Sequence, residues 1–293
     1  MTNIRPSSHN WEDKMSYKTV LVYFNNEKSA DGLIKAAVRL ATSHGSHVIG
    51  LFVTPKVQVF PDVGPGMTAE ILKAHAETFK EEADGIHAKF EKAMAGQPFS
   101  AEWRHADTGY YQTANEIVQQ ARMADILIAP QTDSENPDPN YAGVAEELLI
   151  GCGRPVLIVP AFSGARDFGR HIMLAWNGSR ESARAAFDAL PALKLAEMVT
   201  ILSVESSEKN GQTFIPGSEI ATALARHGVT CDVSMSSGSS LHPGDELLAR
   251  LADANADLLV MGAYGHTRFA EFIFSGVSRH MLKNMTTPLL MSH

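Results

Sequence analysis

The sequence has little cysteine and no long apolar run. Cys152 and Cys231 are its only two cysteines, and they lie far apart. This count excludes a disulfide-stapled scaffold and a cysteine-based metal centre, and it is typical of a reducing compartment. A membrane-spanning helix needs about 20 consecutive, mostly apolar residues, and no segment of the sequence provides them.

Basic charge is also scarce. The chain has 25 Lys and Arg against 33 Asp and Glu, which gives a net charge of −8. This balance argues against a general nucleic-acid or anionic-membrane surface. Residues 1–18 are polar and lack the apolar core of a secretory signal. We therefore expect a cytoplasmic protein with neither nucleic acid nor membrane as a partner.

What the sequence does have is a regular alternation of apolar, β-branched runs with amphipathic helical patterns. This alternation predicts an α/β fold with parallel sheets and helices on both faces. The expected strands are 18–25, 47–54, 100–107, 125–130 and 155–160, then 170–177, 197–205, 229–236, 257–262 and 288–292. The expected helices are 30–44, 68–94, 111–123 and 142–151, then 180–195, 217–227, 243–254 and 277–285.

The two halves of this pattern can be aligned with each other. ADILIAP at 124–130 matches ADLLVMG at 256–262, and residues 142–159 match 275–292 without a gap. Such self-similarity indicates a tandem duplication. We expect domain 1 at 17–162 and domain 2 at 168–293. Most of the length difference lies in a Pro/Gly-rich insertion at 55–67 and in the longer helix after it.

The most informative segment is ADLLVMGAYGHTRFAEFIFSGVS, residues 256–278. A strand-like run ends at Gly262, Gly265 follows, and the small pair Ser275-Gly276 comes next at the start of a predicted helix. Small residues let a backbone approach phosphate oxygens closely, and N–H groups at a helix start attract anions. The arrangement resembles the G-x2-G-x9-G-S/T motif of the universal stress protein family. It differs from the dinucleotide fingerprint, in which glycines open the first βα unit.

The resemblance extends over almost the whole chain and is to a tandem universal stress protein. It implies two flavodoxin-like (Rossmann-like) domains, each a five-stranded parallel sheet, related by a pseudo-two-fold axis with the last strands associated. It also implies that domain 2 binds an adenine nucleotide, ATP with or without Mg. By resemblance, the residues at the nucleotide would be Asn177, Val204, Gly262, Gly265, His266, Ser275, Gly276, Val277 and Ser278.

Two positions depart from the family pattern. Asn177 stands where ATP-binding members usually have Asp, and the order Ser275-Gly276 reverses the usual Gly and Ser/Thr. Ser278 lies one turn away and could replace the missing hydroxyl. Asn177-Gly178-Ser179 can equally be a turn and helix cap without any ligand.

The first half lacks this motif. Pro130 and Asp133 take the places of Gly262 and Gly265, and proline has no N–H to offer. Asp133, Glu135 and Asp138 would also repel a triphosphate. Domain 1 is therefore expected to be a structural or regulatory partner with a degenerate site. The alternative is a different ligand, bound through the 55–67 insertion.

No catalytic or metal-binding motif is recognised. The sequence has no H-E-x-x-H, no Cys/His cluster and no G-x-S-x-G elbow. We expect a stress-response or signalling protein with regulatory ATP and at most slow hydrolysis. One alternative is a nucleotide-independent scaffold with a vestigial site, and another is an enzyme for an adenylated substrate. A protein partner or a homo-oligomer remains open.

Overall fold

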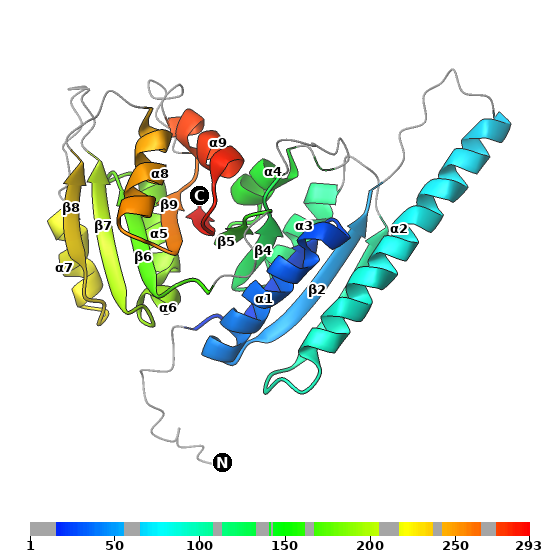
Figure 1. Ribbon diagram of the computed structural model, residues 1–293, viewed down its shortest axis with the longest axis horizontal. Coiled ribbons are helices and arrows are strands. Elements are labelled where there is room, and N and C mark those ends of the chain that lie inside the picture. Colours follow the sequence, from blue (N-terminus) through cyan, green and yellow to red (C-terminus); the bar gives the residue numbers. More distant parts are fainter. Residues whose placement is uncertain are drawn as a thin grey trace, which may run out of the picture.

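The computed structural model describes residues 16–55, 65–107, 113–132, 141, 143–161, 167–204, 217–236, 242–264 and 274–293. Within these ranges the strands form one ten-stranded sheet in the order β3-β2-β1-β4-β5-β10-β9-β6-β7-β8, with helices on both faces (Figure 1). The predicted α/β fold class is confirmed. No helix of the described part is long and apolar enough to cross a membrane.

The two halves have the same strand order. The first half contains β1 (Thr19–Phe24), β2 (His47–Thr54), β3 (Ala101–Asp107), β4 (Ile126–Pro130) and β5 (Val156–Val159). The second contains β6 (His171–Trp176), β7 (Met198–Val204), β8 (Asp232–Ser236), β9 (Leu258–Gly262) and β10 (Leu289–Ser292). All strand pairs within each half are parallel. In both halves the strand order reverses beside the first strand, between β1 and β4 and between β6 and β9.

The halves are joined through their last strands. β5 and β10 pair antiparallel, with Leu289 opposite Ile158 and Met291 opposite Val156. All residues of both strands are buried. The expected association of the last strands is confirmed. Pairing these apolar strands removes two sheet edges that would otherwise invite aggregation.

Helices cover the sheet on both sides. They are α1 (Glu27–His44), α2 (Pro65–Met94), α3 (Thr113–Ala121), α4 (Val144–Gly151), α5 (Arg180–Asp188), α6 (Leu190–Leu193), α7 (Gly217–Ala225), α8 (Pro243–Asp253) and α9 (Phe274–Asn284). In the first half, α1 packs against α2 on one face and α3 against α4 on the other. In the second half, α8 packs against α9 on the face opposite α5 and α7 (Figure 1).

Several predicted boundaries differ from the structure, and three of the differences have a physical reason or bear on the site. The helix expected at 180–195 is divided into α5 and α6, because Pro191 cannot donate the N–H that a continuous helix would need. The helix expected at 277–285 begins at Phe274, so Ser275 and Gly276 lie within its first turn. The insertion expected at 55–67 is partly helical, since α2 begins at Pro65, where proline suits a first helical position. Residues 56–64 lie outside the described part.

A buried tyrosine also connects the two halves. The Tyr17 hydroxyl donates to the carbonyl of Asp188 at the end of α5, 2.8 Å away. The side chain is only 3% exposed, and this burial raises the pKa of Tyr17. The hydrogen bond therefore persists at neutral pH.

Replacing Tyr17 by phenylalanine is expected to lower the free energy of unfolding by about 1 kcal/mol, because the Asp188 carbonyl loses its donor. Urea denaturation followed by circular dichroism would measure this change. Unchanged stability would show that the hydrogen bond contributes nothing to the junction of the halves.

Candidate functional site

The candidate site of the second half lies where β6 and β9 end. In open α/β sheets, ligands bind beyond the carboxyl ends of the strands at the point where the strand order reverses. Here β6 ends at Trp176 and is followed by α5, while β9 ends at Gly262. The start of α9 follows the loop after β9. The fold therefore brings Gly262 against the first turn of α5, which follows the Asn177 turn, and the end of β9 to the start of α9.

The Asn177 turn is held by its own side chains. Asn177 Oδ1 accepts a hydrogen bond from the Ser179 N–H at 3.1 Å, and Gly178 has a φ of 73°. Ser179 caps α5, with its Oγ accepting from the Ser182 N–H at 3.1 Å. These contacts agree with the turn-and-cap interpretation of Asn177-Gly178-Ser179. Any contact between Asn177 and a ligand would be additional to them.

Gly262 is required by packing against α5. A Cβ built at this position would lie 2.6 Å from the carbonyl carbon of Glu181 and 2.6 Å from the nitrogen of Ser182. Both are backbone atoms of the first turn of α5, so they cannot move aside easily. The sequence motif predicted that residue 262 is glycine because the backbone approaches a phosphate closely. The structure gives a reason that needs no ligand, the contact between β9 and α5.

Gly276 is in a different environment. Of the described residues, a Cβ built there would meet only His242, with Nε2 at 3.8 Å, which is an ordinary contact. The residue lies in the first turn of α9, where N–H groups have no acceptor within the helix. Packing therefore does not explain the absence of a side chain, and the first turn of α9 offers donors for an anion.

The other predicted residues at this helix start have structural roles. Val277 is 5% exposed and packs in the core, and Ser278 is 2% exposed. The Ser278 Oγ accepts from the N–H of Tyr264 at 3.3 Å, which connects the end of β9 to α9. Tyr264 has a left-handed φ of 47°. The proposed use of the Ser278 hydroxyl at a phosphate thus competes with this internal hydrogen bond.

Some predicted site residues cannot be placed. Gly265 and His266 lie outside the described residues, as does the side chain of Ser275. Val204 ends β7 and pairs with Ser236 of β8, and its side chain is likewise outside the description. The backbone of Val204 lies at the same edge of the sheet as the other segments.

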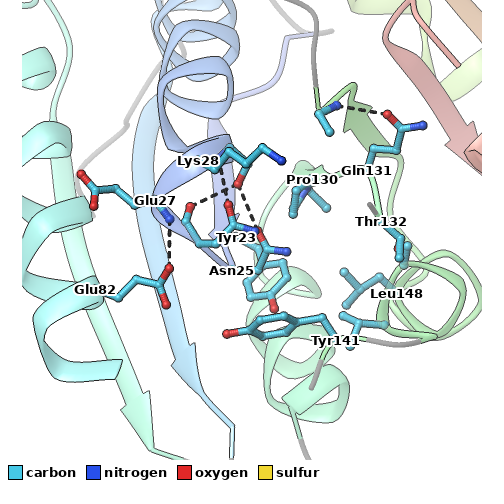
Figure 2. Close-up of a pocket in the computed structure, with 16 residues that line it drawn as sticks. Tyr23, Asn25, Glu27, Lys28, Glu82, Pro130, Gln131, Thr132, Tyr141 and Leu148 are labelled. Carbon is cyan, nitrogen blue, oxygen red and sulfur yellow. Dashed lines mark hydrogen bonds between the residues drawn. The ribbon is translucent and has the colours of Figure 1, made fainter. Parts of the chain in front are cut away.

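The equivalent place in the first half is a pocket of about 300 Å³. Tyr23 from the end of β1, Pro130 from the end of β4 and Tyr141 border the same space (Figure 2). Gly143, the counterpart of Gly276 in the gap-free match, has a φ of 76° and immediately precedes α4. Asp133, Glu135 and Asp138 are not among the described residues. The sequence did not predict this pocket, because the loss of glycines indicated only a broken cradle.

The lining of this pocket includes one lysine, Lys28, and two carboxylates. Glu27 and Glu82 border it on one side, and the Glu27 N–H donates to Glu82 Oε1 at 3.2 Å (Figure 2). Lys89 Nζ lies 3.0 Å from Glu27 Oε1 and offsets part of this charge. Gln131 is used between the halves, since its amide donates to the carbonyl of Leu282 at 2.9 Å. Gln131, which directly follows β4, thus contributes to the junction of the halves.

Comparison with known proteins finds a family similarity in the second half. Residues 169–293 match the Universal stress protein family. The match finds one Usp domain and covers less than half of the chain. It includes both the Asn177 turn and the Gly262–Ser278 segment. The comparison with curated proteins found no match.

Solved structures extend the likeness to both halves. A universal stress protein from Archaeoglobus fulgidus is 16% identical, with a TM-score of 0.67, over 94% of this chain and 98% of its own. A putative universal stress protein from Pseudomonas aeruginosa is also 16% identical, with a TM-score of 0.56, over 97% and 95%. A functionally unknown protein from the same species has a TM-score of 0.55 at 16% identity, over 97% and 94%. At this identity the likeness shows the fold, which both halves of the chain share.

Proposed function

We propose that this protein is a tandem universal stress protein that binds an adenine nucleotide, ATP in our expectation, in its second half as a regulatory ligand. The observation that carries the proposal is the start of α9. Among the described residues, a Cβ at Gly276 would meet only His242 Nε2, at 3.8 Å, and the first turn of α9 presents N–H donors near the point where the strand order reverses. This segment lies within the match to the Universal stress protein family.

In this proposal the first half is a second, degenerate domain of the same kind. Pro130 stands at the end of β4, where β9 has Gly262, and it has no N–H to donate. Glu27 and Glu82 border the corresponding pocket. The first half supports the second through β5 and β10, and ATP is expected to bind at one site per chain.

Isothermal titration calorimetry of the nucleotide-free full chain would test this stoichiometry. We expect one ATP per chain, and no second equivalent site, because Pro130 offers no N–H at the end of β4 and Glu27 and Glu82 border the pocket of the first half. Two equivalent sites would contradict the assignment of the first half.

The rival function is an interaction scaffold in which the site is vestigial. Two hydrogen bonds favour it, since Asn177 Oδ1 and Ser278 Oγ already accept from Ser179 and Tyr264 within the protein. Acid denaturation of the protein as purified from cells would separate the two functions. Released adenine nucleotide supports the binding protein. A nucleotide-free protein that also binds none in calorimetry would support the scaffold.

A further inference from the structure

Three side chains converge between α8 and α9. They are His242, Asp245 and His280. One candidate ligand atom from each lies within 4.8 Å of the others. His242 immediately precedes α8, Asp245 is in its first turn, and His280 comes from the middle of α9. Two imidazoles and a carboxylate are the ligands of three-residue zinc sites that keep a position open for water.

We propose that His242, Asp245 and His280 bind a borderline divalent cation of the zinc class. His280 Nε2 lies 2.9 Å from Asp245 Oδ1. Zinc–nitrogen and zinc–oxygen bonds are about 2.0–2.2 Å long, so two neighbouring ligand atoms on one ion lie about 3 Å apart. The observed separation therefore already suits one ion shared by the two groups.

The burial and the missing hydrogen bond of His280 Nε2 support a ligand beside this atom. The atom is shielded from solvent, yet it forms no hydrogen bond of acceptable geometry with any described residue, Asp245 included. Buried polar atoms of this kind are uncommon and need an explanation. A cation bound between His280 and Asp245 supplies this explanation. The Asp245 carboxylate is exposed, so the ion has a path to enter.

The backbone of α8 is adapted to the His280 ring. A Cβ built at Gly244 would lie 2.5 Å from Cδ2 and 2.9 Å from Cγ of His280. Only the absence of a side chain at this position admits the imidazole beside Asp245. The rings of His242 and His280 have centroids 4.8 Å apart, so both imidazoles face the same region.

His242 is the ligand that must rearrange most. Its Nδ1 accepts from the Gly244 N–H at 3.1 Å. Metal binding through either ring nitrogen gives up this hydrogen bond, because the Nδ1 lone pair is then used by the metal or by a proton. Imidazole ligands select zinc-like ions, whereas Mg²⁺ prefers six oxygen ligands. The site is therefore chemically distinct from the Mg that could accompany ATP, although His242 borders Gly276.

The test is titration of the full chain with Zn²⁺ after treatment with a chelator and removal of any histidine tag and nucleotide. We expect one Zn²⁺ per chain with a dissociation constant in the micromolar range or tighter, and no competition from Mg²⁺. His280→Gln and Asp245→Asn should each weaken binding at least tenfold. His242→Asn should also weaken it, while keeping a side chain that can cap α8.

The matched control is His87→Gln in α2. His87 Nε2 lies 3.3 Å from Glu91 Oε1, so it is a histidine–carboxylate pair without a third ligand, and its loss should leave Zn²⁺ affinity unchanged. Circular dichroism verifies that each variant is folded. The proposal would be overturned if the wild type binds no Zn²⁺, or if folded His280→Gln binds it as tightly as the wild type. The cluster would then be only an ion pair between α8 and α9. Because nucleotide is removed, neither result bears on ATP binding.

Discussion

Replacing Gly262 by alanine is expected to lower the free energy of unfolding by about 2–3 kcal/mol, as overpacking of a tight contact does. The added methyl group would lie 2.6 Å from two backbone atoms of α5, the Glu181 carbonyl carbon and the Ser182 nitrogen. The effect would be steric, because Gly262 is not among the described glycines with positive φ. Urea denaturation followed by circular dichroism would measure it.

Gly276→Ala is the matched control for this experiment. A methyl group at Gly276 would make only one ordinary contact, with His242 Nε2 at 3.8 Å. Alanine is also the better helix former, by up to about 1 kcal/mol in a helix interior. Stability should stay the same or rise slightly. Equal losses in the two variants would show that the close approach of β9 to α5 does not explain Gly262.

Gly276→Val is expected to weaken ATP binding at least tenfold, about 1.4 kcal/mol, while the protein stays folded. A Cβ at Gly276 comes no closer than 3.8 Å to any described residue outside α9, so we expect the valine side chain to collide with a phosphate held by the first turn of α9. Calorimetry with ATP measures the change. Gly265→Asp, which adds a negative charge to the glycine motif, should also weaken binding at least tenfold.

The control for this prediction is Asp133→Gly. It changes the matching position in the first half and should leave ATP affinity unchanged, because that half is not expected to bind the nucleotide. If the wild type and both glycine variants bind ATP with equal affinity, the phosphate-cradle hypothesis is wrong and the scaffold function is favoured.

Much of the fold could be predicted because its signals are local or repeated. Fully buried parallel strands appear as apolar runs, such as DILIAP and DLLVMG. The gap-free match of 142–159 to 275–292 predicted that the last strands are equivalent, and β5 and β10 do pair. Pro191 was a visible helix breaker within 180–195, but the apolar pattern around it is continuous, and the prediction followed the pattern.

The candidate site was less predictable because its determinants are tertiary. Nothing local distinguishes Gly262, which packs on α5, from Gly276, which has open space. The hydrogen bond from the Tyr264 N–H to Ser278 Oγ depends on how the end of β9 packs against α9. His242 and His280 are far apart in sequence, so their meeting follows only from the packing of α8 on α9. The first-half pocket likewise arises from several segments that are separate in the sequence.

The most direct test of the central claim is a structure of the full chain with ATP. We expect the phosphates at the first turn of α9, beside Gly276, and the adenine near the end of β7 at Val204. Nucleotide in the first-half pocket beside Tyr23 and Pro130 would contradict this account, as would the absence of nucleotide at saturating ATP.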